Sequence, residues 1–200
     1  MGHVAAHRGK PRKPKNRAKR KLKSRLLIVV EGDKGKSEQV YFQRLAQILR
    51  SNNVATNIKV VPGKGEPLRV LETCRDHLET DNYDRAFLVV DCDQHTTLSR
   101  VLQLAQKRDI SVAVTNPQFE QWLYWHLHDG GGNPKKVTDV LQRNSYLTGR
   151  NAKELGVTFP VERYPAATAR AERSWTEMRP NAIGPHPSSS IPCLIEAMQK

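Results

Sequence analysis

The chain has 200 residues, of which 38% are hydrophobic, and its 33 Lys and Arg against 20 Asp and Glu give a formal net charge of +13. Eleven of the basic residues and none of the acids lie within residues 1–25, so the other 175 residues carry 22 bases against 20 acids. Because that remainder is nearly neutral, the charge excludes a uniformly basic protein of the ribosomal or chromatin type. It indicates a globular body with a basic arm that could bind something anionic.

The body is long enough for one domain with a hydrophobic core, since a chain of this size buries roughly 70% of its unfolded surface. No apolar run approaches the ~18 residues that span a bilayer, and no apolar h-region of a signal peptide follows the cationic N-terminus. We therefore expect a cytoplasmic protein without a membrane partner. Cys74, Cys92 and Cys193 are odd in number and widely spaced, which argues against a disulfide framework and a structural zinc site.

Residues 1–24 are predicted to form a basic tail that is disordered by itself, because residues 1–23 hold no aromatic side chain and almost nothing apolar to bury. Such a tail is either a solubilising extension or an arm that binds nucleic acid by releasing condensed counterions. Affinity of the second kind is sensitive to salt and indifferent to sequence. The lack of aromatic residues argues against base stacking by the tail.

From Arg25 on, apolar strands alternate with helical patterns. We expect strands at residues 25–31, 56–62, 85–91 and 109–115, each followed by apolar residues at helical spacing. The first strand is a continuous apolar run, which is typical of a strand buried on both sides in a parallel sheet. Four βα units in a row predict an α/β domain with an open, mainly parallel sheet and flanking helices.

The remainder of the chain, residues 130–200, shows no clear strand and is predicted to form an α-helical extension. Three successive glycines mark a flexible break at its start, and residues 180–190 have the composition of a loop. Apolar residues at helical spacing predict a short helix around residues 137–141, a longer one over 160–178 and a final one over 191–198.

Acidic residues follow two of the predicted strands. Glu31 ends the first, and Asp91 and Asp93 follow the third, with both aspartates on one side of an extended backbone. Ligands of open parallel sheets bind beyond the carboxyl ends of the strands. Three carboxylates there would repel one another unless a cation lay between them, and such ligands suit Mg²⁺ or Mn²⁺, which could activate water or polarise a phosphate. An isolated Asp-x-Asp is more often only a cap and a turn.

Four segments carry a resemblance to a known family: EGDKGKSEQVYF (31–42), FLVVDCD (87–93), NPQFEQWLYWH (116–126) and PSSSIPCLIEAM (187–198). An apolar strand ending in Glu-Gly, followed about sixty residues later by one ending in Asp-x-Asp, resembles the Toprim domain of primases, topoisomerases and OLD-type nucleases. In order and spacing the four segments resemble the RloB family, also represented by the AbiLii protein of abortive-infection loci.

The resemblance implies a Toprim-like fold for residues 25–129. It also implies a metal-dependent nuclease that acts in antiphage defence and is often encoded beside an AAA-type ATPase. By the same resemblance Glu31 would be the general base or a metal ligand, and Asp91 and Asp93 would be metal ligands.

The chain departs from the family pattern in two places. Two extra residues lengthen the loop before Ser37-Glu38, and this leaves the role of Glu38 open. Cys92 stands between the two aspartates, where the family often has a basic residue. A phosphate contact at that position would therefore be missing.

The first loop also invites comparison with a phosphate-binding P-loop, because a strand, Gly-Lys-Ser and a helix follow one another. A P-loop needs its first Gly five residues before the Gly-Lys-Ser, and that position is Val30, inside the strand. The spacing therefore argues against an NTPase. Lys34 and Lys36 remain candidates for contacts with a nucleic-acid phosphate beside the acids.

A helix is predicted to begin at Asn116 as N-cap, with Pro117 as its first residue. Its core stripe falls at helical spacing on Phe119, Trp122, Leu123 and His126. Glu120 lies off this stripe and could add a fourth carboxylate to the metal site, or it could simply complement the helix dipole. His126 is predicted first as a core histidine and second as a general acid for a leaving oxygen.

Basic side chains outside the tail and the first loop are scattered along the C-terminal part. Five of them are candidates for nucleic-acid contacts: Lys135, Lys136, Arg163, Arg170 and Arg173. Such a scatter is usually a solvated face, but it could also form the rim of a groove that receives RNA or DNA. Ser190 is predicted to cap the last helix, with a phosphate held by the free amides there as the alternative.

These observations predict a divalent-metal-dependent nuclease that cleaves phosphodiester bonds in RNA, such as tRNA, or in DNA, with Glu31 assisting proton transfer. The competing prediction is a non-catalytic nucleic-acid-binding or sensor subunit, in which the tail supplies affinity and the acids only shape the strand ends. An AAA-type ATPase is the expected partner. The oligomeric state stays open, a homodimer included.

Overall fold

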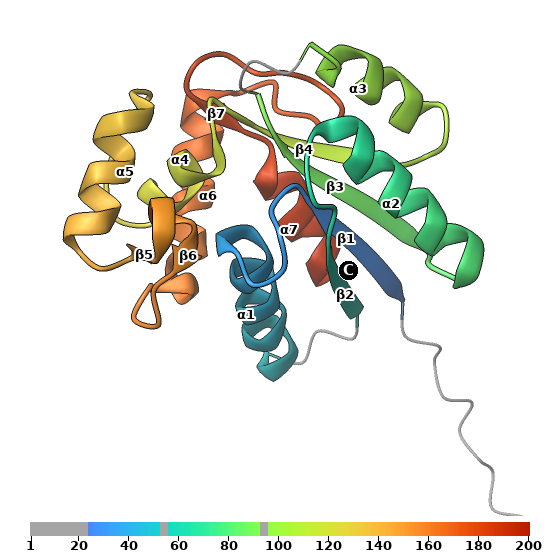
Figure 1. Cartoon of the computed structure of the whole chain (residues 1–200), viewed down its shortest axis with the longest axis horizontal. Coiled ribbons are helices and arrows are strands. Elements are labelled where there is room, and N and C mark those ends of the chain that lie inside the picture. Colours follow the sequence, from blue (N-terminus) through green and yellow to red (C-terminus); the bar gives the residue numbers. More distant parts are fainter. Residues whose placement is uncertain (1–23, 53–55, 93–95) are drawn as a thin grey trace, which may run out of the picture.

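The structure, a computed structural model, describes residues 24–52, 56–92 and 96–200. The predicted basic tail lies outside the described residues apart from Ser24, and Asp93 lies outside them as well. The described chain forms a mixed, mostly parallel sheet of five strands with helices on both faces (Figure 1). The predicted α/β class and open, mainly parallel sheet are thereby confirmed, and the arrangement is consistent with a Toprim-like fold.

Four of the five strands follow the predicted βα pattern and run parallel. They are β1 (Arg25–Val30), β2 (Asn57–Pro62), β3 (Arg85–Asp91) and β4 (Ser111–Asn116). The fifth strand, β7 (Ser188–Ser189), pairs antiparallel with β4 and gives the order β2-β1-β3-β4-β7. Because the first four strands run the same way, their carboxyl ends meet at one edge of the sheet.

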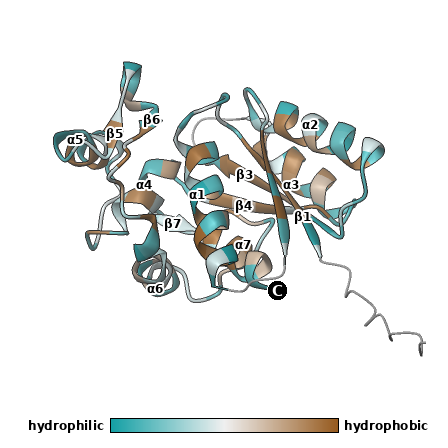
Figure 2. Ribbon diagram, turned by 90° about the horizontal axis from the view of Figure 1, so that it is seen from below, coloured by the Kyte–Doolittle hydropathy of each residue, from teal (hydrophilic) through white to brown (hydrophobic). Residues whose placement is uncertain are grey.

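Helices cover both faces of the sheet (Figure 2). One face carries α1 (Ser37–Ser51) and α7 (Ile191–Gln199), and the other carries α2 (Pro67–Thr80) and α3 (Leu98–Gln106). In β1, Leu26 and Ile28 belong to the first core and Leu27 and Val29 to the second, so burial on both sides explains its continuous apolar run. Among the described residues, no helix has the length and apolar character that crossing a membrane requires.

The C-terminal part holds short strands as well as helices. Its helical elements are α4 (Phe119–Tyr124), α5 (Pro134–Arg143), α6 (Tyr164–Ser174) and the 3₁₀ turns η1 (Arg150–Ala152) and η2 (Val161–Arg163). A hairpin of β5 (Leu147–Thr148) and β6 (Glu154–Leu155) lies between α5 and α6. The prediction that no strand follows residue 130 is therefore wrong. The long helix predicted over 160–178 is also shorter, because a 3₁₀ turn precedes it and Trp175 is already extended.

Polar side chains complete the outer edge of β4. Ser190 does not cap α7 through its side chain; its Oγ accepts a hydrogen bond from the Val114 amide at 2.9 Å, which corrects the predicted cap. Asn181 accepts from the Val112 amide at 2.7 Å and donates to the Ile110 carbonyl at 3.0 Å. These contacts satisfy backbone groups that a longer fifth strand would otherwise pair.

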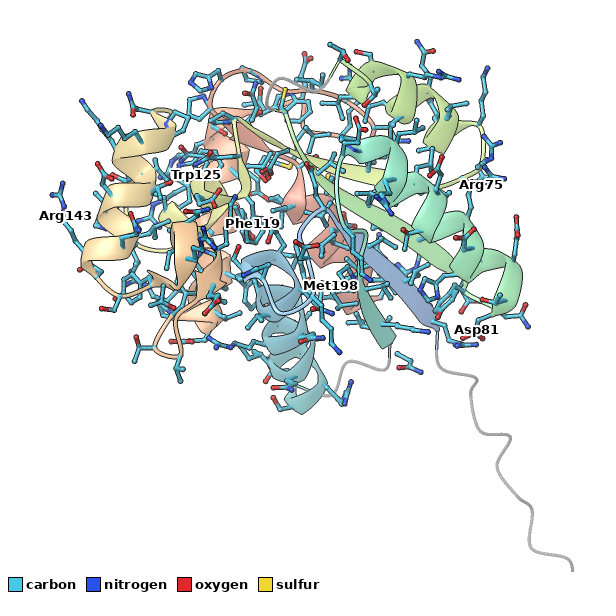
Figure 3. All side chains as sticks on the ribbon, viewed as in Figure 1. Arg75, Asp81, Phe119, Trp125, Arg143 and Met198 are labelled. Atoms are coloured by element: carbon cyan, nitrogen blue, oxygen red, sulfur yellow. The ribbon has the colours of Figure 1, made fainter. Side chains whose placement is uncertain are left out.

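Helix α4 begins later than predicted. Asn116 is the last residue of β4, and its side-chain amide donates to the Gly184 carbonyl at 3.0 Å. The helix begins at Phe119, after Gln118, so the prediction that Asn116 caps it is wrong. The predicted core stripe is nevertheless buried. Figure 3 shows Phe119 and, from α7, Met198 lying inside the molecule.

Candidate functional site

An acidic hollow of about 440 Å³ lies at the carboxyl ends of β1, β2 and β3. We call acidic hollow the site lined by Glu31, Gly32, Asp33, Lys36, Glu38, Lys64, Gly65, Glu66, Asp91 and Lys153. The strand ends, the loops after β1 and β2, the first turn of α1 and the β5–β6 hairpin all contribute to it. This is the edge of an open parallel sheet at which ligands bind.

Glu31 and Asp91, two of the three predicted metal ligands, meet in this hollow. The Glu31 amide donates to the Val89 carbonyl at 3.1 Å, which continues the β1–β3 pairing by one residue. The Glu31 carboxylate then accepts a hydrogen bond from the Asp91 amide at 3.0 Å. The two adjacent strands therefore fix the Glu31 side chain at the end of β3, beside Asp91.

Glu38 is a third carboxylate of the hollow, although the lengthened loop left its role open in the sequence. It lies in the first turn of α1 and is 9% exposed. The Ser37 hydroxyl donates to Glu38 Oε2 at 3.0 Å. A Cβ atom on Gly32 would lie 2.6 Å from the same oxygen, so a glycine at this position lets the Glu38 carboxylate approach the end of β1.

Glu120 and Lys153 form an ion pair at the inner side of the hollow. Glu120 is 5% exposed, and Lys153 Nζ lies 3.7 Å from its Oε1. Burial raises the pKa of Glu120, and the neighbouring Lys153 opposes that rise only in part. The pKa of Lys153 is raised in turn, first by Glu120 and then by Glu38 and Asp91. One ammonium group thus feels three carboxylates that come from three different elements.

Lys153 is the site residue that the sequence analysis missed. It reaches the hollow because the Ser37 amide, at the start of α1, donates to the Lys153 carbonyl at 3.0 Å. A second contact joins Lys36 Nζ to Glu154 Oε1 at 3.5 Å. No motif or spacing marks Lys153 in the sequence, because tertiary contacts such as these bring the β5–β6 hairpin to the carboxyl ends of the strands.

The carboxylates of the hollow decide whether a metal ion fits there. The described residues contain no group of three or more His, Cys, Asp or Glu side chains that could hold a metal ion, and Asp93 lies outside them. Glu31 and Asp91 still match Mg²⁺ chemistry, because this ion usually binds one or two carboxylates, with waters and substrate phosphates completing its coordination. Glu31 and Asp91 therefore have the chemistry of metal ligands, and the described residues add no all-protein cage around them.

A protein-family model described as RloB-like protein matches residues 26–198. The chain belongs to the RloB-like protein family. The RloB-like region runs from β1 to α7 and includes every residue that lines the acidic hollow. The family resemblance of the four sequence segments is thereby confirmed. A comparison with curated proteins gives no significant match.

His126 lies in the core of the RloB-like fold and does not line the acidic hollow. Its Nδ1 is 3.1 Å from the Trp122 carbonyl, which can only accept, so Nδ1 carries the proton. Its Nε2 then accepts from the Tyr41 hydroxyl at 3.1 Å. Burial lowers the pKa of His126 to about 4. The geometry matches the first of the two predicted roles, a satisfied core histidine.

The basic residues predicted to contact nucleic acid are spread over the RloB-like fold. Lys36 lines the acidic hollow. Lys135 and Lys136 are exposed in the first turn of α5, and Arg163 is exposed at the end of η2.

Two of the predicted nucleic-acid contacts instead have partners within the chain. Arg170 donates to Asp129 Oδ1 at 2.8 Å and to the Trp125 carbonyl at 2.7 Å. Arg173 donates to the same Asp129 oxygen at 2.8 Å. Both arginines thereby attach α6 to the segment that follows α4.

Proposed function

We propose that this chain is a divalent-metal-dependent nuclease of the Toprim type that cleaves phosphodiester bonds in RNA, with tRNA as the first substrate to test, or in DNA. One observation carries the proposal: Glu31, Glu38 and Asp91 share a hollow with Lys153 at the carboxyl ends of the strands. An anionic substrate can enter such a site only if cations offset part of the acid charge, which is what a divalent metal and a lysine provide. Membership of the RloB-like family fits a defence-associated role.

In this proposal Glu31 and Asp91 would hold Mg²⁺ or Mn²⁺, which supplies a Lewis acid for the phosphate and lowers the pKa of water. Lys153 would contact a phosphate oxygen, since its raised pKa keeps it charged at neutral pH and it lines the same hollow. Glu31 would take the proton of the nucleophile, either water or a neighbouring hydroxyl. Glu120 would hold Lys153 in place from behind.

The test is cleavage of labelled tRNA, single-stranded DNA and plasmid by the purified protein with Mg²⁺ or Mn²⁺. Each assay is run alone and with an AAA-type ATPase encoded beside the gene, as the proposed partner. Chelation of the metal is expected to stop cleavage. Glu31→Gln, Asp91→Asn and Lys153→Met are each expected to slow it by about 100-fold or more, because each removes a group that acts on the reacting phosphate.

Matched controls are Asp76→Asn and Lys107→Met, which remove the same charges at exposed positions of α2 and beyond α3. Their cleavage rates are expected to equal that of the unaltered protein. Intact nucleic acids under every condition would contradict the nuclease proposal. Equal cleavage rates for the site variants and the controls would show that the catalytic residues lie outside the acidic hollow.

The competing function is a non-catalytic nucleic-acid-binding or sensor subunit. One observation favours it, since the described part of the chain holds no three-residue group that could bind a metal. This function predicts no cleavage by any variant and nucleic-acid binding that Glu31→Gln and Asp91→Asn leave unchanged. Binding and cleavage measured on the same variants therefore separate the two functions.

A further inference from the structure

A second depression, of about 410 Å³, opens beside the acidic hollow at the end of the edge strand β2. We call basic furrow the site lined by Lys34, Val61, Pro62, Gly63, Lys64, Arg69, Thr73 and His77. This lining contains no acidic side chain, in contrast to that of the neighbouring hollow. Lys64 lines both sites, so the furrow and the hollow are continuous at that residue.

One wall of the basic furrow is a stripe of α2. Arg69, Thr73 and His77 are four residues apart, so they lie on one face of the helix and span about 12 Å along its axis. The Thr73 hydroxyl donates to the Gly63 carbonyl at 3.5 Å. A Cβ atom on Gly63 would lie 2.9 Å from the Val70 side chain, so glycine lets α2 approach the end of β2 closely. One wall of the furrow is therefore a regular element that carries Arg69, and Lys34 and Lys64 come from the loops after β1 and β2.

The cations of the furrow are available to an external anion. Within the described chain, no ion pair involves Lys34, Lys64 or Arg69, and all three side chains are exposed. The two other lysines of the acidic hollow, Lys36 and Lys153, differ because each faces a glutamate. Positive charge gathered without internal partners raises the local concentration of anions.

The geometry points to the basic furrow as a binding site for the sugar-phosphate backbone of a nucleic-acid strand that leads away from the acidic hollow. This inference rests on the proposed nuclease function and adds where its substrate strand lies. The stripe on α2 presents a guanidinium and an imidazole, from Arg69 and His77, which are groups that contact phosphates. The furrow lining has no Phe, Tyr or Trp on which a base could stack, so its affinity depends on salt and not on sequence.

The experiment measures binding by fluorescence anisotropy of a short labelled single-stranded RNA and of the DNA of the same sequence. The full chain carries Asp91→Asn throughout, so that any cleavage does not disturb the equilibrium. The variant Lys34→Gln with Arg69→Gln is expected to lower affinity about tenfold at low salt. The slope of log affinity against log salt is expected to fall by about 1.4, since each lost phosphate contact on a single strand contributes about 0.7.

Two matched variants control for charge and for folding. Arg75→Gln removes one cation from α2 away from the furrow lining, at the outer rim of the molecule (Figure 3), and is expected to leave affinity and slope nearly unchanged. Lys34→Arg with Arg69→Lys keeps both charges and is expected to retain binding. Thermal unfolding of each variant checks that these exposed substitutions leave the fold intact.

The outcomes separate the furrow from the nuclease. If binding depends on Lys34 and Arg69 but the protein with its native Asp91 cleaves nothing, the result would support the furrow and contradict the nuclease. Cleavage by the protein with its native Asp91, together with an unchanged affinity and salt slope for Lys34→Gln with Arg69→Gln in the Asp91→Asn background, would overturn the furrow and leave the nuclease standing. Absence of any binding by the parent chain would also overturn the furrow.

Discussion

At the scale of single residues, burial and one neighbouring cation have opposite effects on the pKa of Glu120. Burial raises its pKa, and the neighbouring Lys153 opposes part of that rise. Where the pKa of a carboxyl group is higher in the folded protein than in the unfolded chain, the free energy of unfolding falls as the pH rises through the folded pKa. A divalent cation in the hollow would act in the same direction as Lys153 and favour the charged carboxylate.

His126 gives a residue-scale prediction about pH. Its folded pKa of about 4 lies below the usual 6.5, so the fold stabilises the neutral ring. That contribution is complete above pH 6.5 and is lost as pH falls toward 4, and it amounts to about 3 kcal/mol at most. His126→Phe keeps a ring that cannot titrate but leaves the Tyr41 hydroxyl without an acceptor, at a roughly constant cost of about 1–3 kcal/mol.

The measurement is urea unfolding of both proteins at pH 7 and pH 5. The stability deficit of His126→Phe is expected to shrink by about 2 kcal/mol at the lower pH. Only the unaltered protein is destabilised there, because His126 is protonated at pH 5 in the unfolded chain but stays neutral in the fold. His186→Gln changes a histidine at an exposed position, and the difference in its free energy of unfolding between pH 7 and pH 5 is expected to equal that of the unaltered protein. A constant deficit for His126→Phe would show that His126 is protonated in the fold at pH 5.

At the scale of elements, one asparagine completes the outer edge of β4 at its amino end. Asn181 makes hydrogen bonds to the Val112 amide and the Ile110 carbonyl, and its backbone has a positive φ of 59°. Asn181→Gly keeps that conformation without strain and removes both side-chain contacts. We expect a loss of about 2 kcal/mol in the free energy of unfolding, because the Val112 amide of β4 and the Ile110 carbonyl just before it lose their protein partners.

Urea unfolding of Asn181→Gly checks this expectation. Asn82→Ala is the matched control, since Asn82 is exposed and only its backbone amide, which the substitution keeps, donates to a side chain, that of Asp81. The control is expected to change stability by less than about 0.5 kcal/mol. A similar small change for Asn181→Gly would mean that water replaces the asparagine at the edge of β4.

Elements determined by apolar burial could be predicted from the sequence, whereas elements determined by polar tertiary contacts could not. The apolar strands were predictable because burial on both faces leaves a continuous run of apolar residues, as in β1. Strand β7 was not, because its two serines pair with β4 through polar contacts such as Thr115 with Ser189 at 2.9 Å. The start of α4 was misplaced because Asn116 is held by β4 and Gly184, contacts that no local cap signal reveals.

At the scale of the whole molecule, the charge divides between the tail and the body. Deletion of residues 1–23 removes ten Lys and Arg without touching the described fold. If the tail binds nucleic acid, the deletion is expected to weaken binding and to flatten its salt dependence more than loss of the two furrow cations does. Anisotropy over a salt series measures this, and an unchanged slope would assign the tail to solubility alone.

The candidate site was predictable where it follows from topology. Glu31 and Asp91 could be placed together because parallel strands deliver their carboxyl ends to one edge. Glu120 could be placed near them because α4 follows β4 directly. Lys153 could not, because a backbone contact between Ser37 and a hairpin more than a hundred residues later decides its position.

That contact also sets an order of assembly during synthesis. Glu31, Glu38, Asp91 and Glu120 leave the ribosome before Lys153 does, and α7 packs on the face of β1 only after residues 191–199 have emerged. A nascent chain therefore carries the acids of the hollow without their lysine and without a closed core. The acidic hollow with its full lining therefore forms only after Lys153 has emerged.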